Sequence, residues 1–237
     1  MADRIQEVFP DDNYTNRTLW RKYLPHVQAL MQEDEFIKHR SSIPILFKIL
    51  QIALLAMEDT FEAKSLYKGL LEIYQVEHGP EHLSTLTSMA NLASTYWDQG
   101  RWNEAEKLDV QAMETSKTVL GSEHPDTLTS MANLASTYWN QGRWDEAEKL
   151  GIQVAETRET ELGAEHPDTL TSMANLASTW KSQSRLTDAL TLIDVCCKLR
   201  NRVLGSDRPD TRNSANVFDA WKYELDLLYE QLPCVTS

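Results

Sequence analysis

The chain has 237 residues and the composition of an ordinary folded protein, 41% hydrophobic and 25% charged, so it is neither disordered nor fibrous. Its net charge of -13 argues against a protein that wraps nucleic acid or docks on an anionic membrane, because both tasks need an excess of Lys and Arg. No apolar stretch reaches the roughly 18 residues of a membrane span, and the N-terminus lacks the apolar core of a signal peptide.

The three cysteines point to a reducing compartment. Cys196 and Cys197 are adjacent and Cys234 stands far from them, so no pair has metal-ligand spacing. Cys196 and Cys197 fall on an apolar helical stripe, which predicts buried, free thiols. Free thiols suit the cytoplasm, which is the predicted location.

The first 42 residues carry no repeat. Asn13 to Glu35 is predicted to form a helix, a break at Pro25 and a second helix. Residues 43–79 then contain a weak copy of the repeat that follows, because Leu50 and Ala63 lie 42 residues before matching positions.

The central part of the chain is an internal repeat. The block Leu86–Trp97 returns at Leu128–Trp139 and, nearly unchanged, at Leu170–Trp180. Between residues 84–108 and 126–150, only three of 25 positions differ. The period of 42 residues is marked by Met89, Met131 and Met173. A fixed period of this size predicts a stacked repeat protein.

Each repeat is predicted to contain two helices. The first begins at Pro125, which suits the first helical position because proline has no N–H to leave unpaired. It ends at Gly142, expected in the left-handed conformation. The second helix starts at Asp145, a candidate N-cap, and continues to about Leu162.

The spacing within this unit resembles the tetratricopeptide repeat (TPR), and its 42-residue length is similar to the repeats of kinesin light chains. The resemblance covers about residues 82–208, and its residues are Leu134, Ala135, Tyr138, Gly142, Trp144 and Ala147. It implies an all-α TPR solenoid, a right-handed superhelix of antiparallel helix pairs. It also implies that Trp102 and Trp144 lie in the core.

This resemblance divides the chain into six segments. Arg208-Pro-Asp-Thr opens another first helix, whose predicted stripe includes Trp221 and Leu228. The segments are a helical leader (1–42), a degenerate TPR (43–81), three TPRs (82–123, 124–165 and 166–207), and a capping helix with a tail (208–237).

The stretch Tyr-Leu-Pro-His-Val-Gln-Ala-Leu, followed by repeats with His-Pro-Asp-Thr-Leu-Thr-Ser-Met-Ala-Asn-Leu-Ala, is similar to the C-terminal part of fungal NLR-like proteins. That resemblance implies that residues 1–42 correspond to the junction between a STAND ATPase and its TPR array. No Gly-x4-Gly-Lys-Ser/Thr loop occurs, so the ATPase itself is missing. The chain is then a fragment, a gene remnant or a free-standing TPR protein.

Asn91, Asn133 and Asn175 are the strongest candidates for partner binding. Asn is a middling helix former, so three copies in mid-helix need a reason. An amide offers a donor and an acceptor, which matches a peptide bond. In peptide-binding TPR proteins an Asn at this position holds the ligand backbone, and the resemblance implies that role here. The alternatives are a helix-to-helix hydrogen bond and inheritance through duplication.

Threonine and tryptophan side chains are predicted to extend this surface. Thr87, Thr129 and Thr171 lie one turn before the asparagines and widen the polar strip. Trp97 and Trp139 follow the packed Tyr by one residue, which turns them about 100° towards the groove. They could equally cover the neighbouring helix. The groove lacks the repeated Lys and Arg of a carboxylate clamp.

Catalytic and metal sites are not predicted. His82, His124 and His166 share one repeat position, and copies about 10 Å apart are too distant to share a metal. They are interpreted as turn residues. The cluster of basic residues from Lys198 to Arg212 is interpreted as a solvated face.

The sequence therefore predicts a non-catalytic module that needs no cofactor or metal and binds a protein or peptide in its concave TPR groove. Nucleic acid and membranes are not expected partners, and self-association is left open. The preferred interpretation is the sensor or scaffold arm of a fungal NLR-like protein without its ATPase. The alternatives are a kinesin-light-chain-like cargo adaptor, for which residues 1–42 lack a coiled-coil heptad pattern, and a free-standing TPR accessory protein.

Overall fold

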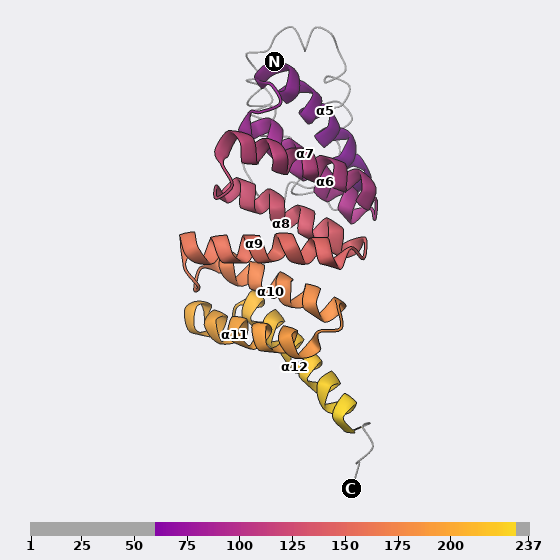
Figure 1. Cartoon of the computed structure of the whole chain (residues 1–237). Helices are drawn as coiled ribbons and strands as arrows, with labels where there is room; N and C mark the ends of the chain where they lie inside the picture. The colour runs from indigo at the N-terminus through magenta and orange to yellow at the C-terminus, as the bar shows by residue number, and fades with distance from the viewer. Residues whose placement is uncertain (1–59, 231–237) are drawn as a thin grey trace. The chain divides into compact units, whose positions relative to one another are not determined.

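The structure is a computed structural model, which describes residues 60–230 (Figure 1). Every regular element in this part of the chain is an α-helix, which confirms the predicted all-α class. The helices are α5 (Thr60–His78), α6 (Leu83–Asp98), α7 (Trp102–Leu120), α8 (Pro125–Asn140), α9 (Trp144–Leu162), α10 (Pro167–Ser182), α11 (Leu186–Leu204) and α12 (Pro209–Glu230). The predicted leader and the first helix of the degenerate TPR lie outside the described residues.

The chain forms two compact units, Met1–Leu108 and Asp109–Ser237, and α7 runs through the boundary between them. In unit 1, α5 packs against α6 and the two helices share a core. Its buried apolar side chains include Leu70, Leu71, Leu86, Met89 and Leu92. The Thr85 hydroxyl donates a hydrogen bond of 2.8 Å to the carbonyl of Gly79, which secures the turn between the helices.

In unit 2, each helix from α8 to α12 packs against the next one in the chain (Figure 1). One core cluster joins Leu128 and Met131 of α8 to Val154 of α9. A second cluster is centred on Leu170 of α10 and on Ile193 and Cys196 of α11. The apolar stripes that the sequence places at three- and four-residue spacing therefore become the contacts between consecutive helices.

The first helix of each repeat begins where the sequence predicts. Pro125 and Pro167 occupy the first turn, and the preceding His124 and His166 are the N-caps. In both, Nδ1 of the imidazole accepts a 3.2 Å hydrogen bond from the backbone N–H two residues later, at Asp126 and Asp168. The histidines are thus turn residues, and they satisfy one of the backbone donors that every helix start leaves unpaired.

The turn to the second helix also follows the prediction, except at its cap. Gly142 has φ 74°, the left-handed conformation in which glycine carries no steric penalty. However, α9 begins at Trp144, and its N-cap is Arg143, which makes no side-chain capping bond. The prediction that Asp145 caps this helix is therefore wrong. Instead, the Arg143 guanidinium lies over the Tyr138 ring, 4.1 Å from its centroid.

The predicted core position of Trp102 and Trp144 is also wrong. Trp144 is 40% exposed and Trp102 is 37% exposed, and both stand at the first residue of a second helix.

The last helix, α12, packs on the α10–α11 cluster through Val217, Phe218, Trp221 and Leu225. The predicted stripe is confirmed at Trp221, but Leu228 is exposed. Within residues 60–230, no helix combines the length and the hydropathy that a membrane span requires.

Candidate binding face

Two of the three predicted asparagines lie in unit 2, in the middle of α8 and α10, which touch each other. Asn133 and Asn175 are exposed. Neither side-chain amide hydrogen-bonds to any residue that the structure describes. Thr129 and Thr171 precede them by four residues and so share the same helix side. We name this side of α8 and α10, with these four residues, the asparagine face.

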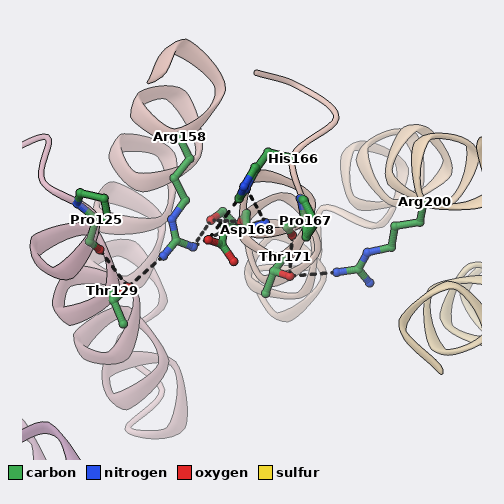
Figure 2. Close-up of polar contacts among 9 residues, drawn as sticks. Pro125, Thr129, Arg158, His166, Pro167, Asp168, Thr171 and Arg200 are labelled. Atoms are coloured by element: carbon green, nitrogen blue, oxygen red, sulfur yellow. Dashed lines mark hydrogen bonds and ion pairs between the residues drawn. The ribbon is translucent and has the colours of Figure 1, made fainter. Parts of the chain in front are cut away.

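The threonines of the asparagine face are already engaged. The Thr129 hydroxyl donates to the Pro125 carbonyl at 2.9 Å, and the Thr171 hydroxyl donates to Pro167 at the same distance. Each hydroxyl oxygen also accepts a hydrogen bond from an arginine of a second helix, as Figure 2 shows. In contrast to the asparagine amides, these hydroxyls therefore help to hold the helices together.

The arginines in question are Arg158 of α9 and Arg200 of α11, which are 8% and 6% exposed. Arg158 donates to the Ser172 hydroxyl at 2.8 Å and to the Asp168 carbonyl at 3.3 Å, while its other terminal nitrogen reaches Thr129 at 3.3 Å. The guanidinium of Arg158 thus links α9 to α8, which precedes it, and to α10, which follows it. We call this arrangement the arginine clamp.

Arg200 repeats the clamp one period later. Its guanidinium donates to Ser214 at 2.5 Å, to the Asp210 carbonyl at 3.1 Å and to Thr171 at 3.2 Å. Neither guanidinium forms an ion pair with a carboxylate of the described residues. Burial lowers the pKa of Arg158 from its ordinary value, because the charged form loses hydration.

The sequence pattern alone does not predict the arginine clamp, because Arg200 belongs to the basic cluster that is interpreted as a solvated face. A signal was nevertheless present. Arg158 and Arg200 stand one 42-residue period apart in the middle of second helices, where solvated side chains have no reason to recur in register. The same register places Ser116 and Tyr74 at the two earlier copies.

The tryptophan of α8 lies at the end of its helix. Trp139 is exposed, and its indole N–H donates a 2.9 Å hydrogen bond to the Ser182 hydroxyl at the end of α10. The Trp139 side chain therefore contacts α10, and part of its ring is exposed to solvent. In unit 1, Trp97 and Thr87 are exposed, and Asn91 is half-buried with no hydrogen bond from its amide to a described residue.

Asn91 and Thr87 line a pocket of about 230 Å³ between α5 and α6. Tyr67, Leu70 and Tyr74 form its wall on α5. No charged residue is among the lining side chains that the structure describes. Asn91, the unit 1 copy of the asparagine position, therefore lines the same pocket as the aromatic side chains of Tyr67 and Tyr74.

Unit 2 also contains a buried carboxyl group, Asp109, in the part of α7 that belongs to this unit. Its side chain is 4% exposed and accepts a 2.7 Å hydrogen bond from the Thr137 hydroxyl of α8. Burial raises the pKa of Asp109 to about 6, and the hydrogen bond from Thr137 offsets part of that effect. Asp109 has no acidic copy one period later, where the residue is Gly151.

The described residues offer no site for a metal ion. They contain no cluster of three His, Cys, Asp or Glu side chains placed to hold a metal. Cys196 is buried and free, as predicted, and Cys197 is half-buried. Burial raises the pKa of the Cys197 thiol to about 11, which keeps it in the unreactive protonated form.

The repeat geometry agrees with the comparison to family models. Matches to the tetratricopeptide repeat model cover residues 50–117, 90–150 and 126–202. The chain belongs to the tetratricopeptide repeat family. TPR repeats are typical of protein–protein interaction scaffolds, which generally have no catalytic centre of their own. No curated protein matches the sequence.

Solved structures support the same fold. A putative kinesin light chain with nearly identical TPR-like repeats from Podosopora anserina is 26% identical, with a TM-score of 0.60 over 79% of this chain and 94% of that one. BtubC (BKLC) from P. vanneervenii is 18% identical, with a TM-score of 0.70 over 93% of this chain and 87% of that one. Apo RapI is 14% identical, with a TM-score of 0.54 over 75% of this chain and 71% of that one. The last two show the fold alone.

Proposed function

We propose that this TPR protein binds an extended peptide segment of a protein partner across the asparagine face, with no catalysis of its own. The observation that carries the proposal is the pair of exposed asparagines, Asn133 and Asn175, whose amides have no partner among the described residues. An amide can donate to a backbone carbonyl and accept from a backbone N–H. Two such amides on adjacent first helices suit a ligand that runs from one helix to the next.

The structure favours the asparagines over the threonines as ligand contacts. Thr129 and Thr171 each donate to a proline carbonyl and accept from a clamp arginine, so a ligand would have to break existing hydrogen bonds. Under this proposal Thr129 and Thr171 form the wall of the groove in unit 2 and Trp139 forms its edge. In unit 1, Asn91 and Trp97 have the corresponding roles.

We further propose that the chain acts as the sensor or scaffold arm of an NLR-like protein and works in the cytoplasm. The similarity of the leader and repeats to fungal NLR-like arrays supports the first part, and the free Cys196 and Cys197 support the second. A kinesin-light-chain-like adaptor is the second candidate, favoured by the 26% identical repeat structure.

The test is a selection of displayed random peptides on the immobilised full chain. The Asn133→Ala/Asn175→Ala variant should lose the peptides that the unaltered chain retains. Asn201→Ala, which removes an exposed asparagine from the second-type helix α11, is the matched control and should keep them. Peptides retained equally by the double variant, with a native circular dichroism spectrum, would refute the assignment.

A further inference from the structure

The pocket of unit 1 occupies the place that the arginine clamp takes in unit 2. Two periods, 84 residues, relate the helices of the two units: α5 and α6 span the same repeat positions as α9 and α10. The clamp residue Arg158 therefore corresponds to Tyr74, and its acceptors on α10 correspond to Ser84 and Ser88. All three of these unit 1 residues line the pocket.

The clamp position in unit 1 is not filled by a guanidinium. Tyr74 stacks on His78, with ring centroids 5.8 Å apart, and His78 stacks on His82 at 4.5 Å. This stack fixes the side chain of Tyr74 against the end of α5. A volume of about 230 Å³ remains open between Tyr67, Leu70, Ser88 and Asn91.

The polar groups of the pocket include the hydroxyl of Ser88. Ser88 is 4% exposed, and its hydroxyl hydrogen-bonds to no described residue. Its copies all have partners: Ser130 donates to a backbone carbonyl, and Ser172 and Ser214 also accept from Arg158 and Arg200. The Ser88 oxygen therefore has acceptor capacity left for a ligand in the pocket that supplies a donor.

From these observations we infer that the pocket binds the guanidinium group of an arginine side chain contributed by the partner. The inference rests on the proposed function, because that arginine belongs to the peptide whose backbone Asn91 holds. The guanidinium would donate to Ser88 and lie against Tyr67 and Tyr74, as Arg158 donates to Ser172 in unit 2.

Charge and size support this occupant. The direct hydrogen-bond acceptors of Arg158 and Arg200 are all neutral hydroxyls and carbonyls, and a carboxylate, that of Asp168, adds an electrostatic attraction at Arg158. The protein also places guanidinium groups on aromatic rings elsewhere, as with Arg101 over Tyr96 at 4.5 Å. A net charge of -13 favours a cationic ligand. A cavity of roughly 150 Å³ accommodates benzene, so 230 Å³ is ample for the four heavy atoms of a guanidinium.

The experiment uses the full chain labelled with ¹⁵N and titrated with N-acetyl-L-arginine N-methylamide. The neutral control probe is the citrulline analogue, which has nearly the same shape and no charge. We expect saturable amide shifts on α5 and α6 for the arginine probe, with at least about tenfold weaker binding for citrulline. Equal responses to both probes, or none to either, would overturn the inference.

Three variants check the position of the site. Tyr74→Arg should fill the pocket from within, as Arg158 does, and abolish the response. Tyr74→Phe should keep it, because the ring remains. Ser88→Ala should weaken it, because the acceptor is lost. A response unchanged in both Tyr74→Arg and Ser88→Ala, with both variants folded, would also overturn the inference. Because the probe needs no peptide, a saturable response alongside a failed peptide selection would refute only the proposed function.

Discussion

At the scale of single residues, the molecule distinguishes side chains that hold the repeats together from side chains left available. Asn133 and Thr129 lie one turn apart on the same side of α8, yet only the threonine has partners among the described residues. This contrast is what separates a candidate ligand contact from a structural one. Exposure alone does not distinguish Asn133 from Thr129, because both side chains are exposed.

Asp109 provides a residue-scale prediction of pH dependence. Its pKa is raised from 3.8 to about 6 in the folded state, so the folded protein keeps a proton that the unfolded chain releases between those pH values. The associated stability is fully present below about pH 4 and is lost as the pH rises through 6. Asp109→Asn should therefore be more stable than the unaltered chain at pH 7, by up to about 3 kcal/mol, and similar near pH 4.

Urea unfolding at several pH values checks this prediction. Asn keeps a carbonyl oxygen that can accept from Thr137, so the change removes the titration and retains the hydrogen bond. Asp226→Asn, at an exposed position of α12, is the matched control and should leave the pH profile unchanged. An unaltered slope between pH 4 and 6 in Asp109→Asn would show that this carboxyl does not titrate as described.

At the scale of helices, the arginine clamp couples each second helix to two first helices. Arg158→Ala should lower the free energy of unfolding by about 2–4 kcal/mol, because three hydrogen bonds and the packing of the side-chain stem are lost. Thr129→Val should cost about 1 kcal/mol. Chemical denaturation of the single and double variants should give a coupling energy of about 0.5–1.5 kcal/mol. Strict additivity would mean that the Arg158–Thr129 contact contributes nothing.

The histidine N-caps give a second prediction at this scale. His166→Ala should destabilise the protein by about 1 kcal/mol, because the Asp168 N–H loses its acceptor at the start of α10. His166→Ser should restore most of that stability, since serine is a preferred N-cap. Thermal unfolding of the three proteins provides the comparison. A serine variant as unstable as the alanine variant would show that the imidazole acts through packing.

Much of the element-level architecture follows from the sequence, because repeats and helix boundaries depend on local chemistry. The His-Pro-Asp start of α8 and the left-handed Gly142 are examples. The failures concern side chains whose neighbours come from other helices. The exposure of Trp144 and the burial of Arg200 depend on which surfaces meet. Within unit 1, Tyr74 stands at the clamp position and lines the pocket, and that correspondence is visible only once the clamp is known.

At the scale of the whole molecule, the repeats have diverged at the clamp position and have kept the asparagine. The clamp position changes along the chain from Tyr74 through Ser116 to Arg158 and Arg200, while an asparagine recurs at positions 91, 133 and 175. Each repeat therefore offers a similar amide beside a different neighbour. Under the proposed function, the amides hold the ligand backbone, and the neighbours select its side chains.

The central claim is tested most directly by the affinity of one selected peptide, measured by isothermal titration calorimetry. The account predicts that Asn133→Ala/Asn175→Ala weakens binding at least about tenfold, since several hydrogen bonds of about 1 kcal/mol each are lost. It also predicts that Asn201→Ala binds as tightly as the unaltered chain. Equal affinity in all three proteins would contradict the claim that the asparagine face is the binding surface.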